Sequence, residues 1–264
     1  LEMEADEITR NLNELANVYV SYATASDING GESDVGGSCG YGGLCGTADQ
    51  VVLSKPETVE NIELGTKWNL FDERLLLSAA VFQIGKDDVM ESVGSAYETL
   101  GTLNTGKNRV RGIEFGAVGN LTDKLSGQFS ASFMEAEVLE AFTANQIGKT
   151  LSNFADDSAH LQLRYQITPK FSFGAGATYS SEMYAGQPDT AAAFDAATGA
   201  YSYRVPSYTV FDAFANYAFT ETLKARLNIG NLFDKNYYLA AYRSGAFTYI
   251  GDARSAQLGF SAEF

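Results

Sequence analysis

Apolar and polar residues alternate strictly over the last ten positions of the chain, 255–264. Ala256, Leu258 and Phe260 are apolar, and the residues between them are small or polar. A period of two places alternate side chains on opposite faces of an extended strand. The segment therefore predicts a strand with one apolar and one polar face. An edge strand of a soluble sheet would show the same pattern. How often the pattern recurs along the chain therefore decides whether the segment is such an edge strand.

The alternation recurs along the chain and is clearest over 125–133 and 171–180. It predicts ten strands, at 17–23, 62–68, 74–89, 104–121, 125–133, 157–167, 171–180, 208–219, 223–230 and 255–264. The strand at 74–89 is apolar on both faces, so the pattern does not show which of its side chains point outward. Residues 1–15 fit either a helix or the end of a strand with its turn, and both alternatives stay open.

Short turns near residues 72, 123, 169 and 221 alternate with much longer loops, so short turns lie on one side and long loops on the other. Aromatic residues gather near the short-turn ends: Trp68, Phe71, Tyr165, Phe171, Tyr217, Phe219 and Phe264. Alternating strands with aromatic girdles are typical of transmembrane barrels. The predicted fold is all-β, a transmembrane antiparallel up-and-down β-barrel. Its small polar residues would under-fill a ten-stranded barrel, which favours a wider barrel with further strands and a plug upstream of Leu1.

Composition agrees with a β-rich chain, with 26 Gly, 17 Phe and 15 Tyr but only 4 Pro among 264 residues. No apolar run is long enough for a transmembrane helix. The net charge of −15 argues against nucleic acid as a partner. Cys39 and Cys45 lie in a Gly-rich segment and are expected to form a small disulfide loop, with free thiols as the alternative.

Four segments, in order, resemble the signatures of TonB-dependent outer-membrane receptors. They are 55–67 (KPETVENIELGTK), 104–114 (NTGKNRVRGIE), 205–212 (VPSYTVFD) and 228–238 (NIGNLFDKNYY). The family usually carries Gly-x-Pro-Arg before its final strand, whereas this chain has GDAR at 251–254. The resemblance covers nearly the whole chain, and its strength lies in the ordered set.

The resemblance implies a 22-stranded barrel filled by an N-terminal plug, with residues 1–264 as the C-terminal ten strands. It implies an outer-membrane receptor of a Gram-negative bacterium, surrounded by outer-membrane lipid, that imports a scarce ligand with energy from the TonB complex. A ferric siderophore is the commonest such ligand. The TonB complex would act through the missing N-terminal part, and the barrel assembly machinery would read the terminal Phe264 as an insertion signal.

Family members capture ligands with extracellular loops, so aromatic loop residues are the candidate ligand contacts. They are Tyr41, Tyr97, Tyr184, Phe194, Tyr201, Tyr203, Tyr242, Phe247 and Tyr249. Exposed rings offer stacking area for a siderophore, corrinoid or sugar. Only one histidine is present, His160, and it is expected to be a solvated wall residue rather than a metal ligand. No catalytic constellation, metal site or cofactor is predicted.

Two other readings remain at this point. A passive porin or a small ten-stranded barrel, acting as an adhesin or structural protein, would share the strand pattern. A soluble β-sandwich binding module would instead leave many apolar faces uncovered.

Overall fold

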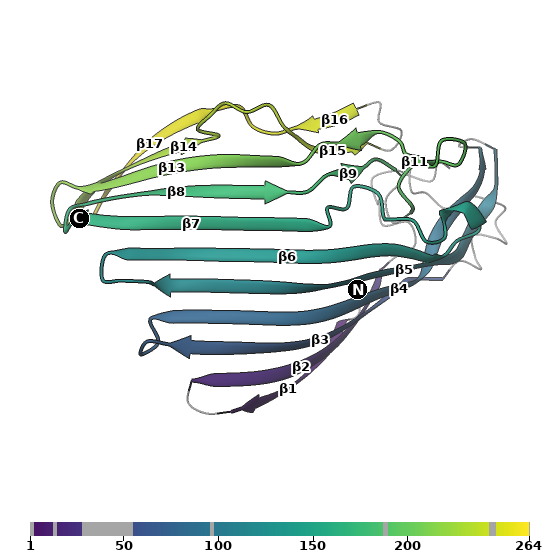
Figure 1. Ribbon diagram of the computed structural model, residues 1–264, viewed down its shortest axis with the longest axis horizontal. Helices are drawn as coiled ribbons and strands as arrows, with labels where there is room; N and C mark the ends of the chain where they lie inside the picture. Colours follow the sequence, from purple (N-terminus) through teal and green to yellow (C-terminus); the bar gives the residue numbers. More distant parts are fainter. Residues whose placement is uncertain are drawn as a thin grey trace.

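A computed structural model describes residues 3–12, 15–27, 55–95, 98–186, 190–242 and 247–263 of the chain. Eleven antiparallel strands form one sheet in the order β1-β2-β3-β4-β5-β6-β7-β8-β13-β14-β17 (Figure 1). Their bounds are β1 Met3–Asn11, β2 Ala16–Asp27, β3 Glu57–Leu70, β4 Leu75–Ser95, β5 Glu98–Asn120, β6 Leu125–Glu140, β7 Asp157–Thr168, β8 Phe171–Ser180, β13 Tyr208–Ala218, β14 Leu223–Gly230 and β17 Ser255–Ala262.

The sheet has one strand more than the ten counted from the sequence, because the open segment at the start forms β1. This strand pairs with β2 from Met3 opposite Ala25 to Asn11 opposite Asn17. The strand alternative for residues 1–15 is therefore confirmed. Within the described residues the only helix is the 3-10 turn η1, Ala144–Gln146, and none is long and apolar enough to cross a membrane.

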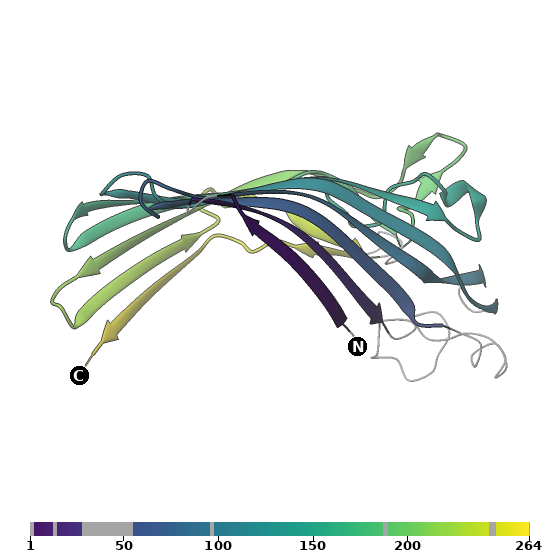
Figure 2. The same ribbon diagram turned by 90° about the horizontal axis from the view of Figure 1, so that it is seen from below.

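The sheet is bent into a trough, whose arch is visible in Figure 2. Its register places whole rows of side chains on one face. Val20, Leu64, Val81, Ile113 and Phe133 form a continuous row on the convex face, and each is 40 to 50 % exposed. Exposed apolar rows need an apolar solvent, which is the situation of a barrel wall in lipid. The predicted apolar faces are confirmed, and the register also settles β4, with Val81 outward.

A row on the concave face, three residues further along the strands, is polar. Lys67, Ser78, Gly116, Ser130 and His160 lie side by side on successive strands. The concave wall thus combines small residues with hydrogen-bonding groups, as expected from the sequence. A wall of this kind holds water or polar ligands.

The two edges of the sheet differ in the length of their connections (Figure 1). Short turns at 71–74, 121–124, 169–170 and 219–222 join strands at one edge, as predicted. Aromatic pairs lie close to this edge, including Phe171 with Tyr217 and Tyr217 with Phe219, whose ring centroids are 6.4 and 4.9 Å apart. At the other edge, longer segments join most of the strands and carry most of the non-sheet structure. β4 and β5 are the exception, because they extend beyond the predicted limits of 89 and 104, to Ser95 and from Glu98.

Three of these longer segments, 141–156, 181–207 and 231–254, pack together into what we call the loop body. It contains short two-stranded sheets, whose strands are β9 Met183–Tyr184, β10 Phe194–Asp195, β11 Ala200–Tyr201, β12 Arg204–Val205, β15 Tyr238–Tyr242 and β16 Phe247–Ile250. Their buried centre consists of Met183, Ala185, Val205 and Ala241, with Ala155 packed against it. The loop edge is therefore a folded layer.

Candidate functional site

Three predicted ligand contacts meet in the loop body. The rings of Tyr184 and Tyr201 stack with centroids 4.7 Å apart, and Phe194 meets Tyr201 edge-on at 5.3 Å. Lys149 Nζ lies 3.8 Å from the centre of the Phe194 ring, close enough for a cation–π interaction. The Tyr201 hydroxyl accepts a hydrogen bond from the Thr150 N–H at 3.0 Å. These rings bind one another and segment 141–156, so their first role is to hold the loops together.

A charged group flanks this aromatic cluster. Glu182 accepts a hydrogen bond from the Tyr184 hydroxyl at 2.8 Å and another from Arg204 Nε at 2.6 Å. These contacts lower the pKa of the Glu182 carboxyl, first through the Tyr184 hydroxyl and then through Arg204. The same bond raises the pKa of the Tyr184 phenol. Glu182 and Arg204 stand at the two ends of segment 181–207, so the pair closes that loop at its base.

Asn153 connects two loops that are distant in sequence. Its side-chain amide donates to the Ala241 carbonyl at 2.8 Å, and its amide oxygen accepts from the Ala241 N–H at 2.9 Å. Its own N–H donates to the Tyr184 carbonyl at 2.7 Å. The φ of Asn153 is 51°, a left-handed conformation that asparagine tolerates better than most residues. This asparagine clasp joins segments 141–156, 181–207 and 231–254.

Three further predicted contacts have rings open to solvent. Tyr203 is 55 % exposed, Phe247 70 % and Tyr249 60 %. Tyr203 also has a φ of 51°, a left-handed conformation that is unusual for a bulky residue. Exposed aromatic rings on this edge suit the capture of a ligand that carries its own flat groups.

The remaining predicted residues cannot all be placed. Tyr242 ends β15 opposite Phe247. Tyr41, Tyr97, Cys39, Cys45 and Phe264 lie outside the described residues.

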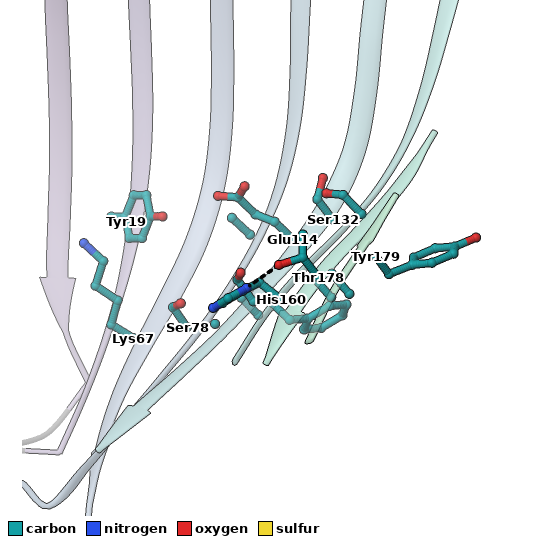
Figure 3. Close-up of a pocket in the computed structure, with 16 residues that line it drawn as sticks. Tyr19, Lys67, Ser78, Glu114, Ser132, His160, Thr178 and Tyr179 are labelled. Atoms are coloured by element: carbon teal, nitrogen blue, oxygen red, sulfur yellow. Dashed lines mark hydrogen bonds between the residues drawn. The ribbon is translucent and has the colours of Figure 1, made fainter. Parts of the chain in front are cut away.

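The concave wall carries a second polar feature, a hollow of about 550 Å³ (Figure 3). On one side of it, the Tyr19 hydroxyl donates to Glu63 at 2.5 Å, and Lys67 Nζ lies 4.9 Å from the centre of the Tyr19 ring. On the other side, His160 Nδ1 is 3.0 Å from the Thr178 hydroxyl. His160 thus lies on the wall, as predicted. In the described part of the chain, no group of three or more His, Cys, Asp or Glu residues could hold a metal ion.

Sequence reasoning missed Lys149, Asn153, Glu182 and Arg204, which organise the loop body. A signal exists for two of them, because Glu182 lies two residues after β8 and Arg204 four residues before β13, at the two ends of one loop. The other two act across separate loops, and no local pattern marks them. The arrangement as a whole offers stacking surfaces, amide groups and ion pairs, which are the means of binding a polar aromatic ligand.

The family model for the TonB dependent receptor-like beta-barrel matches residues 8–232. The chain is 33 % identical over 248 residues to the "Probable TonB-dependent receptor BfrD" of Bordetella pertussis, covering 94 % of this chain and 31 % of BfrD. It is 30 % identical over 256 residues to the catecholate siderophore receptor Fiu of Escherichia coli K12, covering 96 % of this chain and 31 % of Fiu. The chain therefore spans about a third of the length of these relatives.

Solved structures agree with these matches. The crystal structure of the siderophore receptor PiuA from Acinetobacter baumannii superposes with a TM-score of 0.74 at 26 % identity, covering 98 % of this chain and 35 % of PiuA. The closed form of the ferric-catecholate import receptor Fiu gives a TM-score of 0.72 at 27 % identity, covering 97 % of this chain and 34 % of that one. A sheet of this fold is thus about a third of each of these longer receptor chains. This chain belongs to the TonB-dependent receptor family and forms part of its β-barrel.

Proposed function

We propose that this chain is the C-terminal barrel portion of an outer-membrane receptor that imports a ferric siderophore with energy from the TonB complex. The observation that carries the proposal is the pairing of a polar concave wall with a folded, aromatic loop body at one edge. Relatives named as siderophore receptors, including PiuA and Fiu, support the choice of ligand class. The role is that of a transport receptor rather than an enzyme.

The convex face supports a location in the outer membrane. Its exposed apolar rows and the aromatic side chains near the short turns suit a hydrocarbon layer with two interfaces. Lipid would then be the direct neighbour of the convex wall. The long-loop edge would face the outside of the cell and the short-turn edge the periplasm.

Within the loop body, we assign direct ligand contact first to Tyr203, Phe247 and Tyr249, whose side chains are 55 to 70 % exposed. Tyr184, Phe194 and Tyr201 would support them from beneath. The candidates Tyr41, Tyr97 and Tyr242 belong to the same edge by sequence.

Two partners, a plug and one cross-link complete the proposal. A plug and the TonB contact would lie outside residues 1–264, in a part of the polypeptide that corresponds to the additional length of the relatives. The barrel assembly machinery would read Phe264, and Cys39 and Cys45 would form a disulfide after export.

Uptake of ⁵⁵Fe tests the function directly. Cells that lack their own siderophore receptors would express the full-length protein and receive a ⁵⁵Fe-labelled ferric tris-catecholate. Uptake that requires both the protein and TonB is expected. Uptake that persists without TonB would favour the alternative of a passive porin, and an intact mass near the 28.4 kDa of this chain would favour a small barrel.

A further inference from the structure

The concave wall near the short turns holds a group of basic residues. Four basic residues, Arg164, Lys170, Lys224 and Arg226, line a single hollow of about 630 Å³ there. We call them the basic wall patch. None of the described residues that line this hollow is Asp or Glu. In a chain of net charge −15, such a patch departs sharply from the average surface.

Neutral side chains hold the two guanidinium groups in place. Arg164 donates from Nε to Ser172 Oγ at 3.1 Å and from a terminal nitrogen to Gln166 Oε1 at 2.8 Å. Arg226 donates from Nε to Asn228 Oδ1 at 2.9 Å. A guanidinium has five N–H donors, so both groups are oriented while most of their donors point elsewhere. The guanidinium groups are held in a fixed orientation, and their neutral partners do not cancel the positive charge.

The lysines add charge at the rim. Lys224 Nζ is 3.9 Å from Glu263 Oε1, a contact with a carboxylate side chain that is 77 % exposed and therefore weak. Lys170 belongs to the short turn between β7 and β8. The patch therefore keeps an excess of positive charge at this end of the wall.

The register explains the spacing of the patch. Gln166, Ser172, Asn216 and Arg226 form one row across β7, β8, β13 and β14. Arg164 lies two residues from Gln166 on β7, so the two guanidinium-bearing strands are three strand spacings apart, about 14 Å. One extended anion with several acceptor groups could bridge them.

A second hollow, of about 600 Å³, adjoins the first and shares Arg164, Asn216 and Arg226. Its lining adds the ring of Phe214 and the amides of Gln128 and Gln162. An aromatic ring beside guanidinium and amide donors is suited to an anion that itself carries aromatic rings. An aliphatic acidic peptide would use the cations but not the ring.

We propose that the basic wall patch is a binding station for an anionic, aromatic iron chelate, such as a ferric tris-catecholate, on its way along the barrel wall. The inference rests on the proposed import function and adds a second site, at the end of the wall opposite the loop body. Fixed cations on a concave wall raise the local concentration of anions and so favour passage toward the short-turn edge.

The test uses the full-length receptor, with Arg164→Gln and Arg226→Gln combined. The control is the pair Arg74→Gln and Arg111→Gln, which removes the same charge from an exposed turn and from the convex face. Capture of a ferric tris-catecholate at the cell surface should be unchanged in both proteins. The rate of ⁵⁵Fe import should fall about tenfold in the patch variant only, because two charge contacts are lost. Arg164→Lys with Arg226→Lys should restore most of the rate.

The outcomes separate the two proposals. If the wild-type receptor imports no chelate at all, the proposed function fails, and the wall station fails with it. If the wild-type receptor imports and the patch variant keeps its full rate, the station alone is overturned. The patch variant could instead lose thermal stability in the same measure as import, while the lysine variant fails to restore the import rate. That result would assign the patch to docking of an acidic polypeptide segment and would also overturn the wall station.

Discussion

At the scale of single residues, the aromatic side chains of the loop edge divide into two sets. Tyr184, Phe194 and Tyr201 pack against one another, whereas Tyr203, Phe247 and Tyr249 are exposed to solvent. The second set therefore offers the larger exposed ring area to a ligand. The division is invisible in the sequence, since all six residues lie in similar Ala, Gly and Ser-rich loops.

Replacing Tyr203, Phe247 and Tyr249 together by alanine should weaken binding of a ferric tris-catecholate to the full-length receptor at least about tenfold, because each stacked ring contributes about 0.5–1.5 kcal/mol. Titration calorimetry measures the change. Phe71→Ala is the matched control, as this ring is 69 % exposed at the short-turn edge. Equal affinity of the triple variant and the wild type would remove these three rings from the binding site.

Glu182 should make the stability of the loop body depend on pH. Its pKa is lowered in the folded protein by Tyr184 and Arg204. A lowered folded pKa stabilises the loop above the ordinary carboxyl pKa of about 4.3, and this stabilisation is lost as the pH falls through the folded value. Amide exchange of segment 183–205, corrected for the intrinsic rate, should therefore be slower than in Glu182→Gln at pH 7.

The difference between the two proteins should disappear near the acid limit. Glu221→Gln, in the exposed short turn after β13, should show no difference at either pH. A protection gap between wild type and Glu182→Gln that is independent of pH would contradict the assignment of the effect to this carboxylate.

At the scale of elements, strand prediction succeeded where lipid and water demand opposite faces. The alternation at 125–133 predicted β6 because Phe129 and Phe133 face outward while Ser130 and Ser132 face the hollow. The start of the chain gave no such contrast. Apart from Ile8, β1 carries mostly polar residues over its described side chains, so both faces read alike. Pairing with β2, a long-range property, decides its structure.

Gly119, near the end of β5, lies very close to the backbone of Arg74 and Leu75. Gly119 has a φ of 151°, and a Cβ atom there would overlap the carbonyl oxygen of Arg74 and lie 2.8 Å from Leu75 Cα. Gly119→Ala should lower the free energy of unfolding by about 2 kcal/mol or more, because backbone atoms must move. Unfolding of the full-length protein by urea in lipid vesicles gives the value.

Gly85→Ala on β4 is the control for this change, since its Cβ would meet no atom within 4 Å. It should stay within about 0.5 kcal/mol of the wild type. Equal stability of both alanine variants would show that the backbone before β4 can move to accommodate a Cβ atom at position 119 without a cost in stability.

At the scale of the whole molecule, the convex face changes character along the strands. The row containing Phe115, Ala79 and Ala131 is apolar, whereas two rows nearer the loops Gln83, Arg111 and Glu135 lie side by side. Arg111 and Glu135 form an exposed ion pair at 2.7 Å. The upper limit of the apolar band on these strands therefore lies between the two rows.

Lysine scanning can locate this limit. Phe115→Lys, within the band, should cost about 2–4 kcal/mol of unfolding free energy, whereas Gln83→Lys should cost about 0–1 kcal/mol, because the penalty of a charge depends on its depth in the bilayer. Urea unfolding in vesicles measures both. Similar costs at the two positions would mean that the band extends over Gln83 or stops short of Phe115.

The site was less predictable than the fold for a physical reason. Strand faces follow from the local period of the chain, but the loop body depends on contacts such as Asn153 with Ala241, which are 88 residues apart. Aromatic composition pointed to the long-loop edge of the sheet. It did not reveal which rings face solvent, nor that neutral partners orient Arg164 and Arg226 on the opposite part of the wall.

The asparagine clasp bears on how such a receptor could change its specificity. Since Asn153 fastens three loops to one another, a loop grafted alone from a relative would arrive without its partners and leave the amide and the Ala241 backbone unpaired. Successful chimaeras would have to exchange segments 141–156, 181–207 and 231–254 as one unit. If the proposed function holds, the ligand preference of this edge would be carried by a set of loops that must diverge together.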